Sequence, residues 1–453
     1  MSAEEVVVQP SDKLDFKKIL PVFIIILIDL LGLTIIIPLM SLYAVSFGAN
    51  VGTIGLLGAT YPAMQVVGAP ILGRLSDRFG RKPVLLISQL GTFLGFLLLG
   101  LANSLWMLFA ARIIDGLSGA NISTAQAVIS DSTTEKNRTQ GLGLIGAAFG
   151  LGFVVGPVIA FVSLAISGNN YHVPAFVAAG FSLLSILLTN FWLKETHPPS
   201  KEVSLTSRKE ISFRLFLETI KKPFVGFLLV LIFVQQIAFG SFQTLLSLFT
   251  LSRLGLNASG NSVIFIFVGI VVVSVQGYFI GKWSRRFGEV WLIRFGLAML
   301  AFGLLATSLT PRIPPPWYSQ KAVSLELSGG RNVPGETPPT QKLQIDLPPE
   351  ANKGWWGLGW ILLAMVPAAM GGGVLQPSIN SLLTRNVSKV EIGGTLGISA
   401  ALLSAANALA PVIGGAAFQT IGSSGPYWLG ALLVAILLLF SFRGLKTKNQ
   451  NNS

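Results

Sequence analysis

The sequence predicts an all-α membrane protein in which twelve transmembrane helices form two pseudo-symmetric six-helix bundles. Three observations lead to this prediction. First, 52% of the 453 residues are hydrophobic and only 11% are charged, with a mean hydropathy of +0.69, and ordinary soluble proteins do not have this composition. Second, apolar stretches recur at the length of about 20 residues that a helix needs to cross the hydrocarbon core. Third, short motifs recur at long offsets, which indicates two related halves.

Twelve apolar stretches are expected to span the membrane. The first is not expected to be a cleavable signal, because the first sixteen residues are polar and acidic and the apolar run after Lys18 is long enough to span. The expected spans are 19–41, 52–72, 83–103, 105–129, 141–166, 173–193, 223–249, 260–282, 290–310, 356–379, 395–418 and 426–443.

The distribution of Lys and Arg predicts the orientation, since these residues concentrate in segments that are not translocated. Both tails and every second loop, beginning with the loop between spans 2 and 3, hold 24 of the 32 Lys and Arg residues. Both termini are therefore expected in the cytoplasm. The net charge of +13 fits this bias and contact with anionic lipid, and it does not require a nucleic-acid partner. We expect a monomeric, multi-pass protein of a bacterial inner membrane.

The predicted organisation follows from the spans. It comprises a cytoplasmic tail (1–18), a first bundle (19–193), a cytoplasmic linker (194–222), a second bundle (223–443) that includes a Pro-rich extracytoplasmic loop (311–354), and a second cytoplasmic tail (444–453). In the linker, apolar residues from Phe213 to Ile220 fall at helical spacing and predict an amphipathic helix on the membrane surface. The Pro-rich loop is interpreted either as a tolerated insertion or as a segment that caps the exit or binds a partner.

An internal repeat supports the two halves. The stretch GRLSDRFGRKPVLL from Gly73 matches GKWSRRFGEVWLI from Gly281 at an offset of 208, and GPVIAF from Gly156 matches APVIGG from Ala410 at an offset of 254. The difference nearly equals the extra length between spans 9 and 10, so the second half acquired an insertion there. Two parallel halves with the substrate site between them at mid-depth are a known architecture of secondary transporters.

Several kinds of chemistry are excluded. The chain has no cysteine and only two histidines, so disulfides and thiolate metal sites are impossible and we expect no metal and no cofactor. A phosphate loop, zinc-ligand spacing and a nucleophile on a strand-to-helix turn are all absent from the sequence. The protein is therefore not expected to be an enzyme, and an ion gradient would have to supply energy for any uphill transport.

Four motifs resemble those of the major facilitator superfamily, specifically its twelve-helix drug/proton antiporters and, among them, bacterial tetracycline exporters. The GxLxDRxGRK pattern of the loop after span 2 matches the signature of the superfamily. RIIDGLSGA from Arg112 is similar to its second motif, and span 1 is similar to the first-helix pattern through Asp29, Gly32 and Pro38. Span 5 carries the glycine and proline spacing of the antiporter motif, although its terminal glycine pair is replaced here. These residues are Gly143, Gly152, Gly156 and Pro157.

The loop after span 2 combines two glycines, expected to form a tight turn, with one acid and four bases. The resemblance implies that Asp77 faces the N-terminus of span 11 and that Arg81 pairs with Asp131, which together would latch the outward-facing state. The alternative is that the bases only fix the topology. In the repeat copy Arg285 replaces Asp77, so any latch would be one-sided. The latch residues are Gly73, Asp77, Arg78, Gly80, Arg81, Lys82 and Asp131.

In span 5 the glycines allow close helix packing, and Pro157 frees a backbone carbonyl that neighbouring helices must satisfy. The resemblance implies that this segment bends and seals against leakage while spans 5 and 8 rock. Simple tight packing is the alternative, and both can hold together.

Ionisable residues inside spans are the best functional pointers, since each costs at least ~2.5–3.5 kcal/mol at mid-bilayer without a cavity or partner. Arg112 and Asp115 lie three residues apart on one helical face and could form a buried pair. Alternatively, Arg112 tunes Asp29 or Asp115 so that one of them exchanges a proton against substrate. Within a helical turn of Asp29 the sequence contains no basic residue. Arg294 is expected to reach the cytoplasmic interface.

Neutral polar residues complete a candidate cavity, although each could instead form a helix–helix hydrogen bond. Phe239 and Phe242 are candidates for an apolar part of the pocket. The polar candidates are Tyr61, Gln65, Asn121, Gln126, Gln235, Gln236, Gln276, Gln376 and Asn407.

Departures from tetracycline exporters bear on the substrate. The intramembrane acids that those exporters carry in helices 3 and 9 fall on Gly95 and Leu300 here, whereas Asp115 is an acid where the second motif usually has none. This argues against tetracycline–magnesium export and favours equally another amphipathic drug, a lipid-like molecule or a metabolite. Three functions remain open: proton-driven export, uptake by symport or facilitated diffusion, and a transport-inactive receptor or scaffold.

Overall fold

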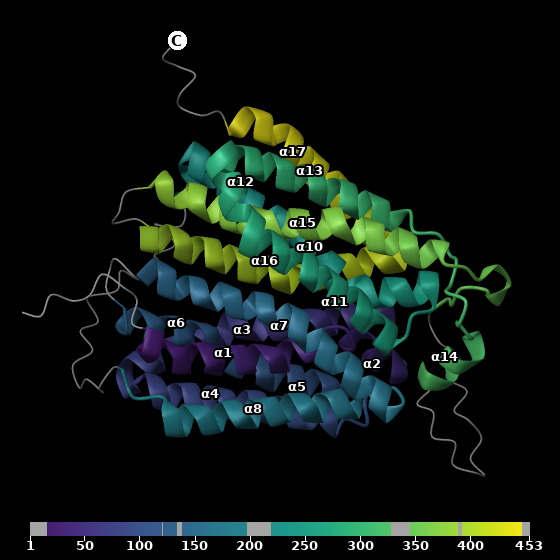
Figure 1. Cartoon of the computed structure of the whole chain (residues 1–453), viewed down its shortest axis with the longest axis horizontal. Helices are drawn as coiled ribbons and strands as arrows, with labels where there is room; N and C mark the ends of the chain where they lie inside the picture. Colours follow the sequence, from purple (N-terminus) through teal and green to yellow (C-terminus); the bar gives the residue numbers. More distant parts are fainter. Residues whose placement is uncertain are drawn as a thin grey trace, which may run out of the picture.

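The computed structural model describes residues 16–119, 121–133, 138–196, 219–327, 345–387 and 392–445. The predicted amphipathic helix of the linker and most of both tails lie outside these ranges. Within them the chain is built from long, nearly parallel helices (Figure 1). Helices suit this apolar sequence because all their backbone hydrogen bonds are internal, as a bilayer requires.

The helices form two halves. The first half contains α1 (Phe16–Ile36), α2 (Met40–Ser46), α3 (Val51–Phe79), α4 (Arg81–Gly100), α5 (Leu105–Ser118), α6 (Asn121–Asp131), α7 (Arg138–Ser167) and α8 (His172–Trp192). The second half contains α10 (Pro223–Leu254), α11 (Ala258–Ser274), the π-helical turn η1 (Val275–Phe279), α12 (Ile280–Phe287), α13 (Glu289–Ser308), α15 (Trp356–Arg385), α16 (Ile392–Ile421) and α17 (Gly425–Gly444). Between α13 and α15 lie α14 (Gln320–Leu327) and the short η2 (Glu350–Asn352).

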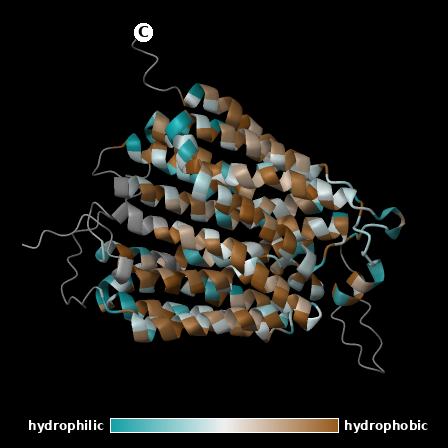
Figure 2. Ribbon diagram, viewed as in Figure 1, coloured by the Kyte–Doolittle hydropathy of each residue, from teal (hydrophilic) through white to brown (hydrophobic). Residues whose placement is uncertain are grey.

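The two ends of the bundle differ. We call the end where α1 begins and α17 ends the termini end, and the opposite end, which carries α14, the insertion end (Figure 1). Figure 2 shows apolar residues along the lengths of the helices and hydrophilic residues gathered toward both ends. Among the described residues, eleven helical stretches are long and apolar enough to cross a membrane.

The span expected at 105–129 is not one continuous helix. The chain forms α5 and α6 there, and Gly119 lies between them outside either helix. The freed carbonyls have new partners: Ser88 donates to the carbonyl of Ser118, and Gln65 Nε2 donates to that of Gly119 at 2.8 Å. Side chains from α3 and α4 therefore replace the helical hydrogen bonds, which is how a broken helix is tolerated at membrane depth.

The predicted tight turn with two glycines is also corrected. Gly73 lies inside α3, which continues to Phe79, and only Gly80 forms the turn, with φ at 99°. Its repeat partner Gly288 has φ at 78° and separates α12 from α13 in the same way. Positive φ favours glycine, so these two positions are the ones that the turn requires.

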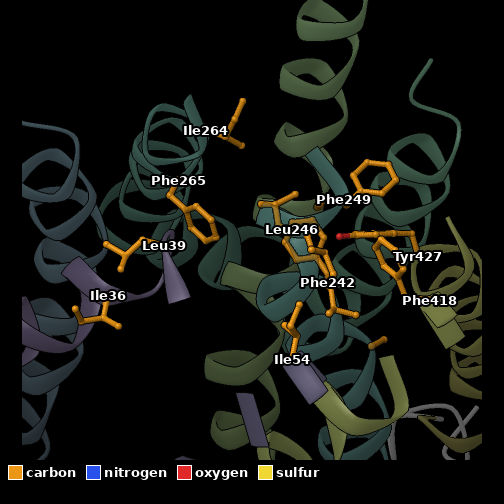
Figure 3. Close-up of a cluster of buried hydrophobic side chains, with 14 of the residues drawn as sticks. Ile36, Leu39, Ile54, Phe242, Leu246, Phe249, Ile264, Phe265, Phe418 and Tyr427 are labelled. Atoms are coloured by element: carbon orange, nitrogen blue, oxygen red, sulfur yellow. The ribbon is translucent and has the colours of Figure 1, made fainter. Parts of the chain in front are cut away.

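The halves meet through α3 against α16 and α7 against α11. One buried apolar cluster joins both halves near the insertion end and continues through the second half as far as Leu445. Figure 3 shows Ile36, Leu39 and Ile54 of the first half together with Phe242 and Tyr427 of the second. Toward the termini end, a separate buried cluster that includes Ile19, Val22 and Leu85 draws only on the first half.

Hydrogen bonds also cross between the halves near the insertion end. Ser41 donates to the carbonyl of Thr244 at 3.0 Å, and Ser247 donates to the carbonyl of Pro38 at 2.8 Å. A side-chain carbon added at Gly55 would lie 2.5 Å from the Pro411 carbonyl oxygen, so α3 and α16 approach closely here. The structure is therefore closed at its insertion end.

Candidate functional site

Two intramembrane acids line one cavity in the first half. Asp29 of α1 and Asp115 of α5 share it with Tyr61 of α3 and the backbone of Gly119 at the helix break. Its volume is about 30 Å³, enough for one or two water molecules. The other lining residues are Val22, Ile25, Ile26, Leu30, Leu33, Leu85, Gln89, Thr92, Phe96 and Ala125. The cavity fits water and a proton, and a drug-sized molecule needs a larger space.

Arg112 and Asp115 form the predicted buried pair. Arg112 Nη1 lies 2.8 Å from Asp115 Oδ2, and Arg112 and Asp115 are only 8% and 2% exposed. The guanidinium carbon also lies 4.4 Å from the centre of the Tyr61 ring. A buried cation is thus held by a carboxylate on one side and an aromatic face on another.

Gly95 of α4 makes room for this arrangement. A side-chain carbon built there would lie 2.9 Å from the Asp115 Cβ and 3.1 Å from the Ala111 carbonyl oxygen. Any larger residue would force α4 and α5 apart, so Gly95 and Asp115 occupy neighbouring positions across one helix contact.

The helix break places polar groups near the acids. Gln65 Nε2 lies 3.4 Å from the Tyr61 hydroxyl in addition to its bond with the Gly119 carbonyl. Gln65 therefore contacts both Tyr61 and the end of α5, and the break there is not predicted from the sequence. Gly116 and Gly119 are the sequence feature that indicates a break here. Side-chain carbons at these positions would lie 2.6 Å and 2.9 Å from atoms of Tyr61, so glycine is needed where α5 ends against α3.

The second half holds a separate polar cluster. Gln236 Nε2 donates to Asn407 Oδ1 at 2.7 Å, and Gln235 Nε2 lies 3.4 Å from Gln236 Oε1. Phe239 packs on Phe242 with ring centres 5.7 Å apart, next to Gly372. These residues face one another across α10, α15 and α16.

Within the described part of the chain, no hydrogen bond joins the remaining predicted polar residues to either cluster. Gln276 donates to the Gly373 carbonyl at 3.3 Å. Gln126 and Gln376 are exposed. The side chain of Asn121 lies outside the described part of the chain. The sequence predicts that these polar residues line one cavity. In the structure, the polar residues form two separate clusters, one in each half.

At the termini end, the predicted pair between Arg81 and Asp131 is present, with Arg81 Nε at 3.0 Å from Asp131 Oδ2. Arg81 Nη1 also lies 2.5 Å from Asp77 Oδ1. The sequence reasoning missed Glu195, whose carboxylate accepts hydrogen bonds from the backbone N–H groups of Arg81 and Lys82 at 2.9 and 3.0 Å. Glu195 thereby caps the start of α4. Arg78 lies over the ring of Phe79.

The second half carries this pair with its charges reversed. At the two repeat offsets, Arg81 corresponds to Glu289 and Asp131 to Arg385, and these two residues form an ion pair at 2.7 Å. Ser284, the counterpart of Ser76, donates to Glu289 at 3.2 Å. An acid at the position of Asp77 is found in the first half alone, since the second half has Arg285 there, whereas the ion pair next to it is present in both halves.

The glycines of α7 bring it against α1. A side-chain carbon at Gly156 would lie 2.1 Å from Thr34 Oγ1, and one at Gly152 would lie 3.5 Å from Leu30 Cβ. Pro157 follows within the same helix. The side-chain position of Gly143 is outside the described residues. Tight packing of α1 on α7 thus explains two of the three motif glycines.

Two further points concern Arg294 and the possibility of a metal site. From the sequence, the Arg294 side chain is expected at the cytoplasmic interface. In the structure its Nη2 atom donates hydrogen bonds to the carbonyls of Ser441 and Leu445 at 3.3 and 3.2 Å, so Arg294 caps the end of α17. Within the described ranges, no group of three or more His, Cys, Asp or Glu side chains could hold a metal ion.

Comparison with known proteins identifies the family. Residues 22–354 match the model of the Major Facilitator Superfamily. The chain is 27% identical to the class H tetracycline resistance protein of Pasteurella multocida, covering 94% of this chain and 96% of that protein. It is 27% identical to multidrug resistance protein 1 of Bacillus subtilis (strain 168), covering 90% and 91%.

Among solved structures, the human organic anion transporter MFSD10 (TETRAN) has the same fold, with a TM-score of 0.64 at 20% identity, covering 96% of this chain and 100% of that one. The family match at residues 22–354 includes both acids of the cavity, the Arg81–Asp131 pair and the described helices from α2 to α14. The chain is a multi-pass membrane protein that belongs to the major facilitator superfamily of transporters.

Proposed function

We propose that this transporter exports a small amphipathic compound in exchange for protons by alternating access, as a monomer in a bacterial inner membrane with both termini in the cytoplasm. The observation that carries the proposal is the cavity in which Asp29 and Asp115 lie beside Tyr61. A carboxyl group at such a site can exchange a proton, and the proximity of Arg112 biases which acid is charged.

Three further observations support export of a drug-like compound. Relatives of this chain carry the names of tetracycline and multidrug resistance proteins. The aromatic and amide residues around Phe239 and Gln236 supply an apolar surface with a few polar groups, which is typical of sites for amphipathic ligands. Asp115 lies directly beside Gly95, where tetracycline exporters carry an acid, so we propose that it takes over that acid's role from the neighbouring helix.

The test is proton movement in inside-out proteoliposomes on addition of a panel of amphipathic drugs. Proton release that depends on a particular compound is the expected result. Substrate-driven movement in the opposite sense would replace the proposal with uptake by symport. Silence across the panel from folded protein would favour a metabolite substrate or a role without transport.

We further propose that Asp77, held in place by Arg81 and Asp131 of its own half, faces the start of α16 in the outward-facing state and so latches the two halves at the cytoplasmic side. Replacing Asp77 with Asn removes the charge that Arg81 contacts at 2.5 Å, and we expect turnover to fall about tenfold, the factor that corresponds to 1.4 kcal/mol. Substrate preference should not change, because Asp77 lies at the termini end of α3, about 18 Å of helix beyond Gln65. Steady-state export measured with several substrates checks this, and wild-type turnover would remove the latch role.

A further inference from the structure

The insertion between α13 and α15 reaches across the boundary between the two halves. Its helix α14 ends with Glu326 and Leu327, and Glu326 accepts three hydrogen bonds from side chains outside the insertion. Asn169 Nδ2 and the Tyr171 hydroxyl donate from the α7–α8 turn of the first half, at 3.2 and 3.0 Å. Asn257 Nδ2 donates from the α10–α11 turn of the second half, at 3.0 Å.

These donors tie the two turns together. Ser259, at the start of α11, also donates to Asn169 Oδ1, so the turns contact each other directly beside Glu326. Asn169 is the one described non-glycine residue with positive φ, at 62°. Asn tolerates this conformation better than most residues. The backbone thus adopts an uncommon conformation at the residue that contacts both Glu326 and Ser259.

The insertion is seated firmly enough to place Glu326. Tyr318, just before α14, is 3% exposed and packs on Gly255 of the second half, where a side-chain carbon would lie 2.0 Å from the Tyr318 ring. The Glu350 carboxylate accepts from the backbone N–H of Gln320 at 2.6 Å, which caps the start of α14. Leu327 is 1% exposed and belongs to the apolar cluster that closes the insertion end.

We propose that α14 is a clasp across the extracytoplasmic gate, in which Glu326 holds the α7–α8 and α10–α11 turns together and must release one of them before the transporter opens outward. The clasp gives the insertion a gating function and makes Glu326 a gating residue of the transport cycle. This inference rests on the proposed function through its assignment of the insertion end to the outside and through alternating access.

The geometry requires such a release. The two turns belong to different halves, and alternating access separates the halves at one end while it closes the other. A carboxylate that bonds to both turns cannot keep all three bonds once the turns move apart. An acceptor that gives up its hydrogen-bond donors loses favourable free energy, so the three bonds to Glu326 favour the closed state over the open one.

Protonation of Glu326 tunes the clasp. Burial raises the pKa of its carboxyl above the ordinary value of 4.5, against the three hydrogen bonds, which lower it. Tyr171 is the titratable group that faces Glu326 from the first half. Asn257 faces it from the second half, α2 contributes no charged residue, and Lys321 is the cation of α14 itself.

Once the clasp opens, water returns the pKa of Glu326 toward its ordinary value. The closed state therefore binds more protons in the window above 4.5. Lowering the pH through this window stabilises the closed clasp, and raising it favours opening.

The experiment measures opening directly, without transport. Because the chain has no cysteine, spin labels can be attached at Leu101→Cys on the first half and Leu309→Cys on the second. Both side chains are exposed at the insertion end, at 57% and 61%. Distances between the labels in lipid nanodiscs report the fraction of molecules open at this end.

In this background Glu326→Ala is expected to raise the open-to-closed ratio about five- to thirtyfold, the factor that corresponds to one or two kcal/mol. Tyr171→Phe, which deletes one donor and keeps the ring, should give a smaller increase. Asp346→Ala is the matched control, since this acid of the same insertion pairs with Arg312 on the surface and its side chain is 83% exposed. Glu326→Gln should remove the pH dependence of the ratio.

The outcomes separate the clasp from the proposed function. An unchanged ratio in folded Glu326→Ala overturns the clasp, even where proton-coupled export is demonstrated. An increased ratio in a protein that exports no drug supports the clasp and counts against export. An equal increase in Asp346→Ala would show that any change in the insertion loosens this end, and would also overturn the assignment to Glu326.

Discussion

Replacing Asp29 with Asn is expected to abolish proton-coupled export while the protein folds normally. Asn has nearly the size of Asp, so the packing of α1 around the cavity of about 30 Å³ should survive. The amide cannot take up or release a proton in the working range of pH, so the exchange of protons for substrate loses one of its two acids. Proton release from inside-out proteoliposomes on addition of substrate is the measurement.

The matched control is Asp346→Asn, which alters an exposed acid outside the spans and should leave coupling unchanged. Substrate binding by the Asp29→Asn variant, measured by tryptophan fluorescence, should persist, because the loss concerns the proton. Full coupled transport by Asp29→Asn would exclude this residue from the proton pathway and transfer the role to Asp115.

The second large effect concerns the buried pair of Arg112 and Asp115. Replacing Arg112 with Leu leaves the Asp115 carboxylate, 2% exposed, without its cation, and the expected loss of stability is ~3–5 kcal/mol. Replacing both residues with Leu should recover most of that loss, since burying an ion pair in place of apolar groups gives little net stability. Thermal unfolding in detergent, followed by intrinsic fluorescence, measures the difference.

Transport by the double variant distinguishes the two interpretations of the pair. A stable double variant that cannot transport assigns Arg112 and Asp115 to the transport mechanism. A stable double variant that transports normally makes them a structural pair. Equal instability of the single and double variants would contradict the electrostatic explanation itself.

The helical class is predictable from the sequence, and the Arg112–Asp115 pair is one of the two interpretations that it allows, because both depend on local spacing. Apolar length gives spans, offset motifs give a repeat, and residues three apart share a helical face. The break before α6 was not predictable in this way, because the partners of its free carbonyls, Ser88 and Gln65, come from other helices. Local glycines signal where a helix can break, and only the tertiary contacts decide that it does.

The clasp was missed for a related reason. Glu326 lies in an insertion whose composition suggests an exposed loop, and its partners are more than sixty residues away in sequence. The one local signal was an acid between Leu325 and Leu327 in a segment with few apolar residues. By contrast, the pair of Glu289 and Arg385 is predictable from the sequence, since the two repeat offsets place these residues at the positions of Arg81 and Asp131.

The charge reversal between the two halves has a consequence for how the molecule is assembled. During synthesis α4 and α6 are complete long before α13 and α15 enter the membrane. If a late helix took an early one's place, Arg81 would meet Arg385, or Asp131 would meet Glu289, and like charges would repel at a partly buried contact. The reversed charges thus disfavour pairing between a helix of one half and a helix of the other, at the repeated motif that the two halves share. Each ion pair forms only between helices of the same half.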